Sequence, residues 1–109
     1  MQVIILPEVL EYFEELAEIL YEEGYFGFEE SALDYFIELY DDIIANLPTK
    51  QHKHAPMFFD TYGKGMKYAV FRKSRRTCWY AFFKKYHKNG EIFFVVRYVA
   101  NNHVIAQHL

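Results

Sequence analysis

Hydrophobic positions in the first half of the chain follow the spacing of two helices. A short apolar run at residues 3–6 has the pattern of a buried strand. Pro7 follows it, and the first turn of a helix accepts proline because the missing N–H would have no partner there. From residue 8 to residue 23, and again from residue 33 to residue 47, apolar side chains recur every three or four positions. The short break at Gly24 predicts that these two helices form an antiparallel hairpin.

The second half of the chain has the pattern of three consecutive strands. They cover residues 66–73, 77–86 and 91–100, and the connections between them are short and polar. Connections this short join antiparallel strands. The middle run is apolar at both odd and even positions, which is typical of a central strand covered on both faces. Residues 49–64 show no periodicity, so a loop is expected there, of a length that is often functional.

The pattern as a whole predicts one α+β domain over residues 1–109. In this domain an N-terminal strand and an antiparallel helical hairpin pack with a mainly antiparallel sheet, which a C-terminal three-stranded meander completes. The composition, 52% hydrophobic and 20% aromatic, is that of a globular chain with one modest core. Residues 101–109 fit either a short helix or an irregular end.

The chain shows no sign of export or of membrane insertion. Its N-terminus lacks the basic segment and the long apolar segment of a secretory signal, and no apolar run approaches the roughly 18 residues that a membrane span requires. Cys78 is the only cysteine, so an internal disulfide is excluded and an inert core thiol is expected. We therefore expect a cytoplasmic protein that does not associate with a membrane.

Charge divides the chain into an acidic and a basic part. Residues 1–49 hold 13 of the 15 acidic residues and none of the 12 Lys and Arg, whereas the remainder holds all 12 cations, 2 acids and all 5 His. The formal charges of the two parts are −13 and +10. This asymmetry predicts an acidic and a basic side of the molecule. The basic side is either an ordinary solvated surface or, because aromatic residues are interleaved with its cations, a surface for nucleic acid.

Arg97 is the most conspicuous residue of the last predicted strand. It interrupts an apolar run and is followed by Tyr98 and by the polar residues 101–103, Asn-Asn-His. A core strand does not need this cation, so Arg97 either binds an external anion such as phosphate or pairs with a carboxylate of the protein. Strict strand alternation turns Arg97 and Tyr98 to opposite faces of the sheet unless a β-bulge intervenes.

The order strand, two helices, three strands resembles that of the RelE/ParE superfamily, the toxins of bacterial type II toxin–antitoxin modules that are also called plasmid stabilization proteins. The resemblance covers essentially the whole chain. It is carried by a basic and apolar run at residues 66–72, an Arg-led aromatic run at 76–83 and an apolar run at 92–98 that ends in Arg97-Tyr98. It implies a single RelE/ParE-like toxin domain over residues 1–109 and a cognate antitoxin whose tail folds across the toxin.

The resemblance also implies an activity. Members similar to RelE cut mRNA in the ribosomal A site, an mRNA interferase (endoribonuclease) reaction that needs neither metal nor cofactor. A ribose 2′-OH attacks the adjacent phosphate, so one group removes a proton, another protonates the leaving 5′-oxygen, and cations stabilise the phosphate oxygens. The residues that match the family's catalytic positions are Arg97, Arg76, His103 and Tyr98.

Further cations are expected to bind nucleic acid beside these positions. They are Lys67, Arg72, Arg75, Lys84 and Lys85. Because antiparallel neighbours lie side by side, the strands are expected to bring Arg97 and Arg76 together with Lys67 or Arg72.

Other interpretations of the same residues stay open. ParE-like members inhibit DNA gyrase without cleaving RNA, and a degenerate member would only bind its antitoxin. The lysines and the turn arginines fit a solvated surface equally well, and the exposed sheet edges fit a homodimer. No glutamate of the basic part suggests itself as a catalytic base. His52 and His54 lack the third ligand that a metal site needs, so no metal is expected.

Overall fold

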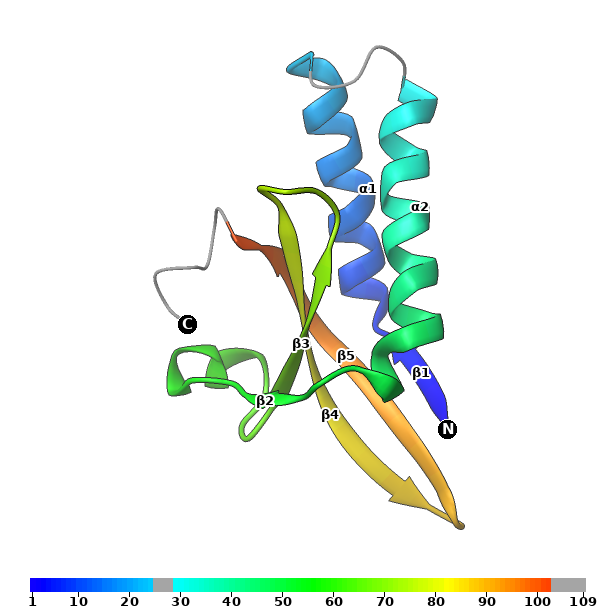
Figure 1. Cartoon of the computed structure of the whole chain (residues 1–109), viewed down its shortest axis with the longest axis vertical. Coiled ribbons are helices and arrows are strands. Elements are labelled where there is room, and N and C mark those ends of the chain that lie inside the picture. Colours follow the sequence, from blue (N-terminus) through cyan, green and yellow to red (C-terminus); the bar gives the residue numbers. More distant parts are fainter. Residues whose placement is uncertain (25–28, 103–109) are drawn as a thin grey trace.

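Two helices lie side by side across one face of a twisted five-stranded sheet (Figure 1). The computed structural model describes residues 1–24 and 29–102. The strands are β1 (Gln2–Ile5), β2 (Lys53–His54), β3 (Lys67–Arg72), β4 (Cys78–Lys88) and β5 (Glu91–Asn101), and the helices are α1 (Pro7–Glu22) and α2 (Glu29–Asn46), with two short 3₁₀ helices, η1 (Leu47–Thr49) and η2 (Met57–Tyr62). Within the described residues, no helix is long and apolar enough to cross a membrane.

The sheet has the order β1-β5-β4-β3-β2, so the first and the last strand of the chain are neighbours. β1 runs parallel to β5, with Gln2 beside Phe93 and Ile5 beside Val96, and all other neighbouring strands are antiparallel. A parallel neighbour requires a long connection, and the helical hairpin forms the first part of it. The predicted α+β class is confirmed, and β3, β4 and β5 are consecutive antiparallel neighbours.

Residues 49–64 contain more regular structure than the sequence predicts. β2 adds a two-residue edge to the sheet, with Lys53 beside Tyr68 and His54 beside Lys67. The N–H of Ala55 extends this pairing by donating a 2.9 Å hydrogen bond to the backbone carbonyl of Met66, the residue before β3. The 3₁₀ helix η2 follows. The expectation of a plain loop is wrong because a two-residue strand and a 3₁₀ helix are too short to produce a hydrophobic period.

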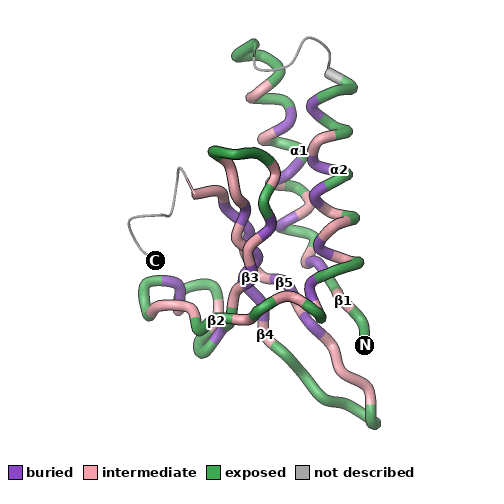
Figure 2. Tube along the Cα trace, viewed as in Figure 1, coloured by how far each residue is buried: buried purple, intermediate pink, exposed green. Residues whose placement is uncertain are grey.

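The main core lies between the helical hairpin and the sheet (Figure 2). Phe13 of α1 and Phe36 of α2 stack with ring centroids 5.5 Å apart, and Trp79 of β4 lies edge-on to both. All three side chains are buried. The indole N–H of Trp79 donates a 2.9 Å hydrogen bond to the hydroxyl of Tyr35. The apolar stripe seen in each helical sequence is therefore the surface that covers β4.

A smaller core lies on the opposite face of the sheet. It consists of Phe59, Met66, Phe82 and Ala100, and η2 supplies Phe59. The rings of Phe59 and Phe82 stack with centroids 4.4 Å apart. Because Phe82 is buried here and Phe83 is buried in the main core, β4 is covered on both faces, as predicted.

We expect Phe36→Ala to lower the free energy of unfolding by about 3–5 kcal/mol, because it leaves a cavity against Phe13 and Trp79. The matched control is the next residue. Ile37 is 55% exposed, so Ile37→Ala should change the free energy of unfolding by no more than about 0.5 kcal/mol. Urea denaturation followed by circular dichroism measures both. Equal losses for the two variants would contradict this packing of α2.

Candidate functional site

β5 contains a β-bulge at Arg97. In the pairing with β4, Phe82 lies opposite Tyr98 and the next residue, Phe83, lies opposite Val96, so Arg97 is the extra residue. Arg97 and Tyr98 therefore both contact the segment that contains η2, and they line one cavity. The expectation from strict alternation, that the two side chains lie on opposite faces, is wrong because of this bulge.

The cavity that Arg97 and Tyr98 line has a volume of about 420 Å³. It lies where the chain leaves β1 for α1, beside the part of β5 that β1 does not cover. Its polar groups are one guanidinium, one carboxylate and three phenols, and its other walls are aliphatic. The lining residues are Leu6, Glu8, Val9, Tyr12, Tyr62, Arg97, Tyr98 and Val99.

Arg97 has hydrogen-bonding capacity that the protein does not use. Its Nη2 donates a 2.8 Å hydrogen bond to the hydroxyl of Tyr86, whereas its Nε is buried and has no hydrogen-bond partner among the described residues. Within residues 1–24 and 29–102, no carboxylate forms an ion pair with the guanidinium. The alternative of an internal ion pair is thus not seen in this part of the chain. Because Arg97 is half-buried, guanidinium N–H groups other than the buried Nε can bind an external anion.

Two of the tyrosines of the cavity titrate at higher pH than ordinary phenols. The rings of Tyr62 and Tyr98 stack with centroids 4.0 Å apart and planes inclined by 9°. Burial, with a smaller contribution from the Tyr62 phenol, raises the pKa of Tyr98 from 10.0 to about 12. Burial also raises the pKa of Tyr12. Tyr98 therefore keeps its proton at neutral pH, so it can donate a hydrogen bond or a proton but cannot act as a base.

Arg76 lies far from the cavity. It occupies the turn between β3 and β4, where its backbone carbonyl accepts a 3.1 Å hydrogen bond from the side-chain amide of Asn102. The amide oxygen of Asn102 accepts a second hydrogen bond, of 3.0 Å, from the N–H of Cys78. Arg76 lies six positions before Phe82 at the bulge, which is about 20 Å along a strand. The strand register thus does not bring Arg76 and Arg97 to one phosphate.

Two further arginines lie at the same end of the sheet as Arg76. Arg72 is the last residue of β3, and Arg75 is exposed in the turn that follows. Arg72 lies close to Tyr80 on the neighbouring strand. Burial raises the pKa of Tyr80, and the charge of Arg72 opposes that shift. These arginines, with Arg76, form one basic group at the β3–β4 turn.

The predicted lysines form a second basic group at the other end of β4. Lys67, Lys84 and Lys85 line a hollow of about 220 Å³ together with Phe83 and Gly65. The Nζ of Lys85 also lies 5.6 Å from the centroid of the Phe94 ring. Along β4, the arginine group lies on one side of the bulge at Phe82 and Phe83, and the lysine group lies on the other side. The expectation that these cations form one cluster is therefore wrong.

The histidines and the cysteine have roles outside the cavity. The Nε2 of His52 lies 2.8 Å from the carbonyl oxygen of Leu47, and its ring packs edge-on against Phe83 at 4.7 Å. In the described part of the chain, no group of three His, Cys, Asp or Glu could hold a metal ion. Cys78 is half-buried, so the expectation of a core thiol is wrong. His103 lies outside the described residues.

Three residues of the cavity, Glu8, Tyr12 and Tyr62, are not expected from the sequence. From the sequence, a catalytic glutamate is considered only in the basic part of the chain, residues 50–109, where acids are nearly absent. Glu8 lies in the acidic part, residues 1–49. The parallel pairing of β1 with β5 brings the first turn of α1 beside the bulge. One signal exists in the sequence, since an apolar strand that leads directly into Pro7 and Glu8 places a carboxylate at the end of a strand.

We expect absorbance titration of the tyrosines to reveal a phenol that ionises near pH 12 and that disappears in Tyr98→Phe. The folded protein favours the neutral form of Tyr98, so the stability that this group contributes is complete below pH 10 and is lost as the pH rises through about 12. Unfolding by urea across this pH window should depend less on pH in Tyr98→Phe. An unchanged titration curve in the variant would contradict the buried phenol.

The cavity at Arg97 thus combines a guanidinium that has no carboxylate partner among the described residues, a carboxylate from α1, and the phenol of Tyr98, which holds its proton at neutral pH. These are the groups that bind an anionic ester and move protons at it. Protein-family models, curated proteins and solved structures were each compared with the chain, and none matched.

Proposed function

We propose that the chain is a RelE/ParE-like toxin that inhibits translation by cleaving ribosome-bound mRNA at the Arg97 cavity. The observation that carries the proposal is the Arg97 guanidinium, which has no carboxylate partner among the described residues and keeps a buried Nε without a hydrogen bond. A phosphate group offers the paired oxygens that such a fork binds. The order of one strand, a helical hairpin, the two-residue strand β2 and three long antiparallel strands supports the same proposal through its resemblance to the superfamily.

Three polar groups of the cavity, Glu8, Tyr98 and Arg97, each receive a step in this reaction. A ribose 2′-hydroxyl gives its proton to Glu8 and attacks the adjacent phosphorus, so the O2′–P bond forms. The P–O5′ bond breaks and the leaving oxygen takes a proton from Tyr98, which produces a 2′,3′-cyclic phosphate and a free 5′-hydroxyl. Arg97 stabilises the negative charge on the non-bridging phosphate oxygens. The scheme uses no metal and no cofactor.

The other cations bind the RNA away from the reacting phosphate in this proposal. The arginine group at the β3–β4 turn and the lysine group beside Lys67 flank the bulge, so phosphates on both sides of the cleaved bond can meet positive charge. Arg76 is therefore assigned to RNA binding rather than to catalysis. His103, outside the described residues, is the alternative proton donor.

The proposed function fixes the partners and the compartment. Ribosomes and mRNA place the protein in the cytoplasm, and a cognate antitoxin would restrain the activity. The antitoxin would have to cover the Arg97 cavity or the basic groups beside it, because these are the parts that the proposed reaction uses.

Arg97→Ala should slow mRNA cleavage on translating ribosomes by about 10²- to 10³-fold, because it removes the donor that stabilises the phosphate charge. Arg97→Lys should restore little of the cleavage rate, because an ammonium group cannot bind two phosphate oxygens at once as a guanidinium does. The matched control, Lys73→Ala, removes an equal charge on the helical side of the sheet, where Lys73 pairs with Glu38 at 3.4 Å. Mapping of new mRNA 5′ ends in a purified translation system measures all three variants.

The same assay separates the alternatives. Arrest of translation by the wild-type protein without new mRNA 5′ ends would contradict the enzymatic proposal. Inhibition of DNA supercoiling by gyrase at stoichiometric protein would then identify a ParE-like toxin. A protein that neither arrests translation nor inhibits gyrase would be a member that only binds its antitoxin.

Glu8→Gln should also slow cleavage, by about 10²- to 10⁴-fold, because the amide cannot accept the 2′-hydroxyl proton. It should leave the affinity for RNA nearly unchanged, which distinguishes it from loss of the Arg97 cation. Glu11→Gln is the matched control, since Glu11 is an exposed carboxylate one turn further along α1 and outside the cavity. Full activity of Glu8→Gln would exclude Glu8 as the base and leave the role to a residue elsewhere.

A further inference from the structure

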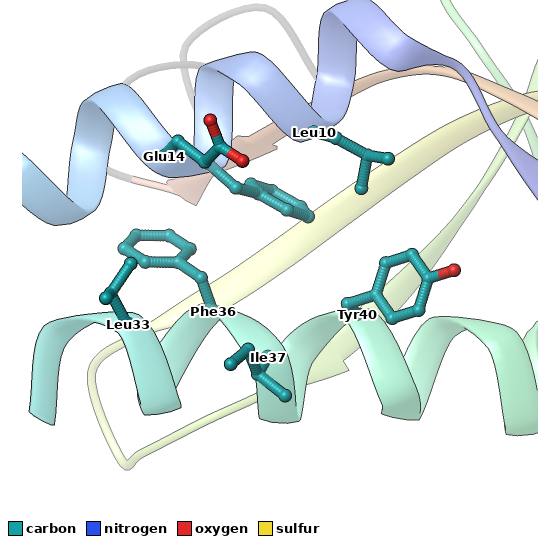
Figure 3. Close-up of a pocket in the computed structure, with 7 residues that line it drawn as sticks. Leu10, Glu14, Leu33, Phe36, Ile37 and Tyr40 are labelled. Carbon is teal, nitrogen blue, oxygen red and sulfur yellow. The ribbon is translucent and has the colours of Figure 1, made fainter. Parts of the chain in front are cut away.

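The helical hairpin carries an apolar groove that the proposed reaction does not use. The groove lies between α1 and α2 and has a volume of about 340 Å³. Figure 3 shows the lining residues Leu10 and Glu14 on α1 and Leu33, Phe36, Ile37 and Tyr40 on α2. It shares no lining residue with the Arg97 cavity. A ligand in the groove would therefore leave that cavity free.

The groove has a buried floor and exposed walls. The floor is the stacked pair Phe13 and Phe36, each of which is 4% exposed. On the walls, Leu33 is 41% exposed and Ile37 is 55% exposed. On α2, the lining residues Leu33, Ile37 and Tyr40 are spaced i, i+4 and i+7. The groove therefore extends over about two helical turns, or about 10 Å. Adjacent apolar side chains left in solvent in this way mark a surface for another molecule.

The charge around the groove selects the kind of partner. Residues 1–49, which include both helices, carry 13 acids and no Lys or Arg. In the described part of the chain, the one ion pair that reaches the hairpin joins Lys73 to Glu38. The other exposed acids beside the groove form no ion pair with the described residues. They are Glu11, Glu14, Glu18, Asp34 and Asp41.

We infer that this groove binds a basic amphipathic helix of a partner protein. Apolar side chains spaced i, i+4 and i+7 on that helix would enter the groove, as helix-in-groove complexes do. Its Lys and Arg side chains would then lie over the acids on both rims, which favours association and sets its orientation. A second copy of this chain bound through the same surface would bring two acidic hairpins together. The negative charges of the two hairpins would repel each other, and they would also repel the phosphates of nucleic acid.

Two matched peptides test the inference with the full chain. Both have about 14 residues and leucines spaced i, i+4 and i+7. The remaining positions are Lys in one and Glu in the other. Fluorescence anisotropy should show that the Lys peptide binds at least about tenfold more tightly than the Glu peptide, and that its affinity falls when salt rises from about 0.05 to about 0.5 M. Methyl resonances of Leu10, Leu33 and Ile37 should shift when the Lys peptide is added.

Variants of the hairpin locate the binding site. Ile37→Gln and Leu33→Gln should each weaken binding of the Lys peptide by about tenfold or more, because both remove apolar surface from the groove. Ile19→Gln is the matched control, because Ile19 is a comparably exposed apolar residue, 46% exposed, that lies outside the groove. It should bind like the wild type. Thermal unfolding by circular dichroism confirms that each variant is folded.

Three results would overturn the inference. The first is equal binding of the Lys and Glu peptides, or no binding of either. The second is binding of the Lys peptide that Ile37→Gln and Leu33→Gln leave unchanged, since the peptide would then lie elsewhere. The third is a dimer of the protein, measured by light scattering, that Ile37→Gln dissociates, because the groove would then belong to a second copy of the chain.

Discussion

The parallel pairing of β1 with β5 is the constraint on which the candidate site depends. β1 ends at Ile5 beside Val96, and the N–H of Leu6 closes the pairing with a 3.2 Å hydrogen bond to the carbonyl of Val96. β5 continues to Asn101, so its edge is uncovered from the bulge onward. Pro7 begins α1 at that point, and the first turn of the helix lies beside the uncovered edge. The cavity therefore exists because two paired strands differ in length.

The two layers of the fold carry opposite charge, and apolar packing between them stabilises the contact. Phe13, Phe36 and Trp79 join the hairpin to β4, whereas the ion pair Lys73–Glu38 has an exposed carboxylate and contributes little. The shortest dimension of the molecule is 24 Å, about three Debye lengths at physiological salt. The acidic hairpin and the basic sheet can therefore act on different partners, because salt screens one surface from the other.

The sequence predicts the elements that bury a long stripe and the short apolar strand β1, and it misses β2 and η2. Both helices and the three long strands have a clear period or an apolar run, so their types and most of their bounds follow. The β-bulge at Arg97 cannot be predicted from the sequence, for a different reason. Phe94 and Val96 are buried in the main core, and beyond the bulge Val99 takes over that role, so the parity of buried positions changes. Residues 92–99 are otherwise apolar, and an apolar run conceals such a change.

The placement of Arg97 costs the fold stability, and this cost bears on its role. Its buried Nε loses hydration without gaining a partner among the described residues, a penalty of about 1–3 kcal/mol. The chain also adapts to the side chain at Gly63, where φ is 152° and a Cβ atom would lie 3.1 Å from the Cδ of Arg97. An aliphatic residue in the bulge would avoid the penalty. Under the proposed function, an anion bound by the other N–H groups of the guanidinium would offset this cost.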